Sequence, residues 1–133
     1  MTKTDLAALE RLINFPFRPT SVKWSTTKHP KGDDWVLTAL LSFPREDIVR
    51  LLQSPEASGE GRMNVARDVF AGWFPPSAQN DYKTQMDIGS DVELIGVQVP
   101  GSLFAAPEKS PAIHGRALVL EKYDLVYLGL FTM

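Results

Sequence analysis

The stretch ALVLEKYDLVYLGLF, residues 117–131, has the strongest β-strand pattern in the chain. Two apolar runs, 117–120 and 125–131, flank a polar turn, and this arrangement predicts an antiparallel hairpin with a short loop. Apolar residues fall on both faces of each strand: in the first, Leu118 and Leu120 oppose Ala117 and Val119, and in the second, Leu125, Tyr127 and Phe131 oppose Val126, Leu128 and Leu130. A sheet that is covered on one side normally alternates apolar and polar residues. Both faces of this hairpin therefore need to be covered.

The preceding sequence supplies the other predicted elements. Apolar spacing predicts helices over residues 6–13, with Thr4 as N-cap, over 44–53, and over a segment that Asn64 caps and the Pro75-Pro76 pair ends. Residues 21–27 and 35–43 are predicted to form a hairpin, and 92–99 a further strand, whereas 57–61 has a loop composition. We expect one α+β domain over residues 1–133: a mostly antiparallel sheet of about five strands, with about three helices packed on one face.

Helices on one face leave the other face of the hairpin without cover. Residues 77–88, to which the pattern assigns no element, are one candidate to fold over it. The alternative is a second protein chain, either another copy of this one or a different partner, that docks on the hairpin. In that case Tyr127 and Phe131 are the predicted binding residues.

Composition narrows the classes of function. The 133 residues include 14 basic and 16 acidic side chains, for a net charge of −2, so we expect no nucleic-acid partner. The absence of cysteine excludes disulfides and thiolate metal sites. No run approaches the roughly 18 apolar residues of a membrane span, and no apolar signal core follows the first residues, so a cytoplasmic location is the default expectation.

Few residues suggest catalysis. The GEGRMN sequence at 59–64 resembles a phosphate-binding loop, but no strand is predicted before it, and a plain connection is the better interpretation. The histidines are His29 and His114, and each is a candidate general base. With Asp33 or Asp34 they form the single two-histidine, one-carboxylate set available for a metal. Nothing in the spacing brings His114 near His29, and no bound cofactor is predicted.

A basic segment offers a third kind of site. Arg18, Lys23, Lys28 and Lys31 occur without an acidic residue among them, with Trp24 in their midst. They can contact an anionic ligand, or they can line the solvent side of an edge strand. The tryptophans at 24, 35 and 73 each fall on a predicted apolar face and are assigned to the core.

These observations favour a non-enzymatic binding or protein-interaction module that uses an apolar sheet face or a loop. The alternatives are a small enzyme that uses one of the histidines, with or without a metal, and a binder of anionic ligands through residues 18–31.

Overall fold

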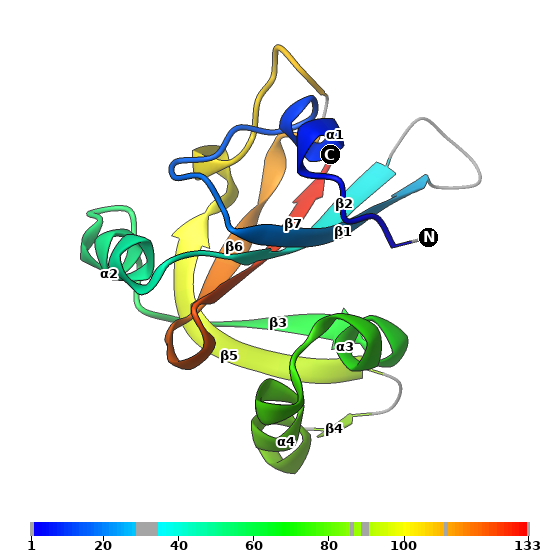
Figure 1. Cartoon of the computed structure of the whole chain (residues 1–133), viewed down its shortest axis with the longest axis vertical. Helices are drawn as coiled ribbons and strands as arrows, with labels where there is room; N and C mark the ends of the chain where they lie inside the picture. The colour runs from blue at the N-terminus through cyan, green and yellow to red at the C-terminus, as the bar shows by residue number, and fades with distance from the viewer. Residues whose placement is uncertain (1, 29–34, 86, 89–90, 111, 133) are drawn as a thin grey trace.

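All strands that the structure describes belong to one antiparallel sheet. The computed structural model describes residues 2–28, 35–85, 87–88, 91–110 and 112–132. The strand order is β1-β2-β7-β6-β5-β3, and the two-residue β4 pairs with β5 (Figure 1). The bounds are β1 Ser21–Lys28, β2 Trp35–Ser42, β3 Glu60–Ala66, β4 Asp87–Ile88, β5 Asp91–Pro100, β6 His114–Leu120 and β7 Leu125–Phe131. The predicted α+β class and the two predicted hairpins, β1-β2 and β6-β7, are confirmed.

The described residues also form four α-helices and two short 3-10 helices. They are α1 Leu6–Glu10, α2 Arg45–Gln53, α3 Arg67–Trp73, α4 Pro76–Gln85, η1 Gly101–Leu103 and η2 Glu121–Tyr123. The prediction for α2 is confirmed, whereas α1 is shorter than expected and has a different cap. The carboxylate of Asp5, not the hydroxyl of Thr4, accepts from the backbone N–H groups of Ala7 and Ala8 at 2.9 and 3.3 Å. None of the described helices has the length and apolarity to cross a membrane.

The prediction for residues 60–66 is wrong. Glu60–Ala66 is strand β3 and not a loop followed by a helix, so Asn64 lies within a strand opposite Glu93 instead of capping a helix. Gly61 allows this pairing: a Cβ at that position would lie 2.6 Å from Oε1 of Gln98. The segment at 77–89, which had no assignment, contains most of α4.

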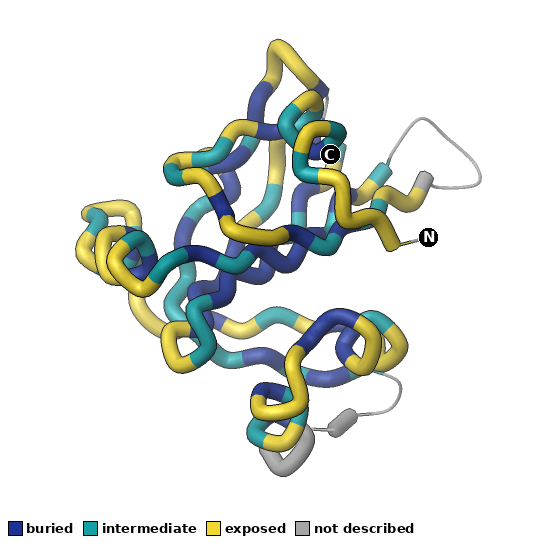
Figure 2. The backbone as a smooth tube through the Cα atoms, in the orientation of Figure 1, coloured by how far each residue is buried: buried dark blue, intermediate teal, exposed yellow. Residues whose placement is uncertain are grey.

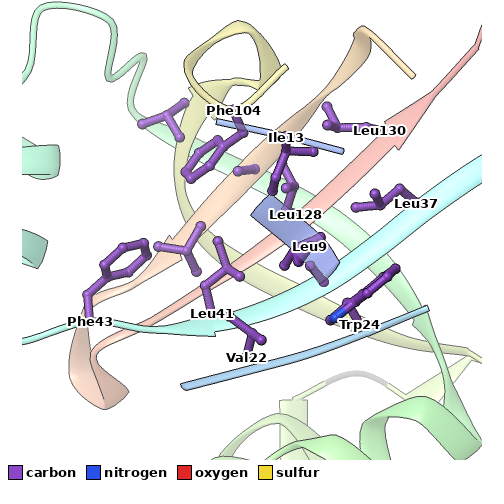
Figure 3. Packing of buried hydrophobic residues seen from close by; sticks show 14 of the residues in the cluster. Leu9, Ile13, Val22, Trp24, Leu37, Leu41, Phe43, Phe104, Leu128 and Leu130 are labelled. Atoms are coloured by element: carbon purple, nitrogen blue, oxygen red, sulfur yellow. The ribbon is translucent and has the colours of Figure 1, made fainter. Parts of the chain in front are cut away.

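One face of the sheet packs against α1, α2 and η1. Leu9 and Ile13, from α1 and the turn after it, lie over Leu37, Leu128 and Leu130 and are fully buried (Figure 3). Ile48 and Leu51 of α2 and Phe104, which follows η1, complete this first core. The alternating apolar residues of β2 and β7 thus receive their cover on this side.

The opposite face is covered by α3 and α4, so the prediction that the helices pack on one face needs correction. Leu118, Leu120 and Tyr127 lie in a second cluster with Phe70, Trp73, Phe74, Ala78 and Tyr82. Strand β5 is strongly bent, and its first half runs with β3 beside α3 and α4 (Figure 1). A hairpin that is apolar on both sides therefore ends up between two layers of its own chain.

Candidate functional site

The second face of the sheet ends in a row of four side chains from four adjacent strands. The register pairs Thr27 with Val36, Val36 with Phe131, and Phe131 with His114. Because residues that oppose one another point to the same side of a sheet, these side chains form one continuous line. We call Thr27, Val36, Phe131 and His114 the end row.

The end row is exposed, whereas the same face is buried a few residues away. Along β7, Tyr127 is 5% exposed and packs on Phe74 at a ring separation of 6.1 Å, but Phe131 is 42% exposed. Val36 beside it is 45% exposed. Figure 2 shows mostly buried residues in the middle of the sheet, and β7 changes from buried residues to an exposed one at Phe131. The helices α3 and α4 thus cover only part of the second face.

The side chain of Met63, from β3, lies at the boundary between the covered and the open part of the second face. A Cβ at Gly129 would lie 3.2 Å from the terminal methyl carbon of Met63, so Met63 reaches across the face to the backbone of β7. Gly129 lies between the buried Tyr127 and the exposed Phe131 on this strand. Beyond Met63, the apolar surface of Val36 and Phe131 is open.

Basic side chains from the strands lie on this face of the sheet. The ring of His114 lies 6.0 Å from that of Phe131, and Arg116, one position further along the same face, donates from Nη1 to Oε1 of Gln98 at 3.2 Å. The alternation of β1, β2, β3, β5, β6 and β7 brings Lys23, His114 and Arg116 to this side and no aspartate or glutamate from the described strand residues. The open apolar surface therefore borders the ring of His114 and the guanidinium group of Arg116, both of which can donate hydrogen bonds.

Tyrosines on the covered part of this face are held neutral. Burial raises the pKa of Tyr127 well above its ordinary value, and the charge of Asp91 raises it further. Burial also raises the pKa of Tyr82, whose hydroxyl donates to the carbonyl of Ile95 at 3.3 Å. Both phenols act as packing groups and not as bases.

The sequence-predicted site residues that the structure describes lie at several places on the fold. Phe131 and His114 lie together in the end row, but Tyr127 is buried, so Phe131 is the member of the predicted binding pair that a partner can reach. Arg18 is in an exposed ion pair with Glu10 at 3.2 Å, on the side of the sheet where α1 packs. Lys28 is the last residue of β1. Of the basic segment, Arg18 and Lys23 thus lie on different sides of the sheet.

Most of the predicted metal set lies outside the described residues. His29, Lys31, Asp33 and Asp34 fall in the undescribed range 29–34. Within the ranges that are described, no group of three or more histidine, aspartate or glutamate side chains is placed to hold a metal ion. His114, the described histidine, has an aromatic ring as its neighbour.

Val36 and Arg116 were not predicted as site residues. Val36 belongs to a strand whose opposite face is apolar, and Arg116 precedes the hairpin stretch. Their roles depend on the β2-β7 and β6-β7 registers, which join residues far apart in the sequence. Val36 departs from the apolar-polar alternation of its strand, and this was the available sequence signal for the site. Without the strand register, Val36 could not be linked to Phe131.

Comparison with known protein families, curated proteins and solved structures gives no match to this chain.

Proposed function

We propose that this protein is a non-enzymatic binding module that holds a short segment of a partner protein on the end row. The observation that supports this most directly is the juxtaposition of Val36 and Phe131, 45% and 42% exposed, on adjacent strands. Large apolar side chains that are exposed side by side favour contact with another apolar surface. Aromatic residues in such positions often dominate binding energy.

The charges specify the kind of segment. His114 and Arg116 border the apolar pair, and Arg116 has no carboxylate within ion-pair distance in the described structure. A partner that places an apolar side chain on Phe131 and a carboxylate toward Arg116 satisfies both features. The proposed ligand is therefore an acidic peptide segment with at least one large apolar residue.

A second copy of this chain fits the surface less well. In a symmetric dimer the same patch contacts itself, so the guanidinium group of Arg116 beside one end row would approach that of the other. Like charges across an interface oppose association. We therefore favour a different protein as the partner.

The test uses a phage-displayed library of random peptides selected on the purified protein. We expect enriched peptides to combine aspartate or glutamate with a large apolar residue. Their affinity should fall by at least about tenfold with either Phe131→Glu or Arg116→Glu, since both changes act on the binding surface. Val49→Glu is the matched control, because Val49 is also exposed, at 38%, but lies on α2.

Two results would contradict the proposal. One is a library that yields no peptide whose binding depends on Phe131. The other is light scattering that shows a dimer which Phe131→Glu converts to a monomer, because the end row would then be a contact between copies of this chain.

A further inference from the structure

A hollow at the other end of the second face is lined by both apolar and polar side chains. It encloses about 290 Å³ between the start of β1, the end of β2, the link from α3 to α4, and the turn before β7. This volume is close to the lower end of the range for ligand pockets, about 300–1,000 Å³. Its lining residues are Ser21, Val22, Lys23, Leu40, Ser42, Trp73, Pro75, Tyr123 and Leu125.

The register explains how the pocket is built. Ser21 and Lys23 point to the same side of β1, and their partners on β2 are Ser42 and Leu40. Two hydroxyl groups and one ammonium group therefore lie at one side of the pocket. Leu40, Trp73 and Leu125, each at most 5% exposed, supply an apolar wall.

Lys23 is a half-buried cation without an anionic partner. Its Nζ donates to the carbonyl oxygen of Trp73 at 3.1 Å, and no described carboxylate lies within ion-pair distance of it. An ammonium group has three N–H donors, so this bond leaves two for another acceptor. A charge that is partly removed from water is stabilised by a counter-ion. The pocket therefore has a place for one negative charge.

We propose that this pocket binds a small carboxylic acid with an apolar body. The carboxylate would accept from Lys23 and from the hydroxyls of Ser21 and Ser42, while the body would lie against Leu40 and Trp73. A monoanion fits better than a phosphate monoester, because the described lining includes one cation and a phosphate carries nearly two negative charges at pH 7. This site is separate from the end row, so it does not depend on the proposed function.

The test compares octanoate and 3-phenylpropanoate with the corresponding alcohols by isothermal titration calorimetry. We expect each acid to bind the wild-type protein at least about tenfold more tightly than its alcohol, because a charge-assisted hydrogen bond contributes more than a neutral one. Backbone amide shifts in NMR spectra should be centred on residues 21–23 and 40–42. Saturable binding that prefers the acid and shifts these amides supports the proposal.

Three variants test whether the charge of Lys23 is responsible for the preference for the acid. Lys23→Met should abolish the preference for the acid, and Lys23→Arg should retain it. Lys109→Met is the matched control, because Nζ of Lys109 also donates to main-chain carbonyl groups, those of Glu10 and Ile13 at 2.9 and 3.3 Å, but lies outside this pocket. The proposal is overturned if neither acid binds saturably, if acid and alcohol bind equally to the wild-type protein, or if Lys23→Met binds the acids as the wild type does. The wild-type comparison decides the question even if a variant fails to fold.

Discussion

Glutamate substitutions at two positions of β7 test which part of the second face is covered and which part is open. Tyr127 and Phe131 lie on the same side of β7, four residues apart, so both would present the new carboxylate to the same face. We expect Tyr127→Glu to unfold the protein and Phe131→Glu to leave it folded.

The magnitudes follow from the surroundings of each side chain. Tyr127 is 5% exposed, and loss of a buried aromatic group costs about 3–5 kcal/mol. A buried carboxylate without a cation adds about 3–5 kcal/mol, and the charge of Asp91, which already acts on Tyr127, would oppose it. The sum is comparable with the whole stability of a small domain, about 5–15 kcal/mol. At Phe131, which is 42% exposed, the carboxylate stays in water near His114, and we expect a cost of about 1–2 kcal/mol.

Urea unfolding followed by far-ultraviolet circular dichroism measures both changes. Phe131→Glu should give a cooperative transition with a slightly lowered midpoint, and Tyr127→Glu should show no native baseline. Equal losses of stability in the two variants would refute the reasoning, because Phe131 would then be packed as tightly as Tyr127 and the end row would not be open.

Three further predictions concern the fold. Gly115 has a φ of 137°, and a Cβ there would lie 2.0 Å from the carbonyl oxygen of Gly129, so Gly115→Ala should lower the free energy of unfolding by about 3 kcal/mol or more in urea titrations. Gly72→Ala is its control: a Cβ there meets nothing within 4 Å, and in helix α3 alanine should stabilise by about 0.5–1 kcal/mol. Because burial raises the pKa of Tyr127, the folded state keeps its proton above the unfolded value of about 10, and stability should fall as the pH rises beyond it. Tyr127→Phe should reduce this loss of stability by up to about 1.4 kcal/mol per pH unit. If the urea midpoints of the wild type and the variant change in the same way from about pH 8 to 11, the prediction is wrong. Asp5→Ala should cost about 1 kcal/mol in thermal unfolding, since it removes the cap of α1, and an unchanged melting temperature would show that the cap contributes nothing.

The candidate site was only partly predictable. The doubly apolar hairpin singled out Phe131, because period-two alternation is a local property that the sequence displays directly. The same pattern also suggested Tyr127. Tyr127 and Phe131 lie on the same face of β7, but other segments of the chain cover only Tyr127. The difference arises from α3, α4 and Met63, which reach the face from residues far away in the chain. Lys23 was grouped with Arg18 by sequence proximity, yet their side chains contact different sides of the sheet.

The sequence by itself determined the elements whose signals are local. The β1-β2 and β6-β7 hairpins and helix α2 follow from periodicity, turn residues and proline positions within short windows. Strand β3 has glycine, arginine and asparagine where strands usually have branched or aromatic residues, and its conformation is set by pairing with β5, about thirty positions away. Tertiary structure alone decided that the helices divide between two faces and that their cover ends before Phe131. The physical reason is that alternation specifies which side chains share a face, whereas the extent of that face that is buried depends on the distant segments that pack on it.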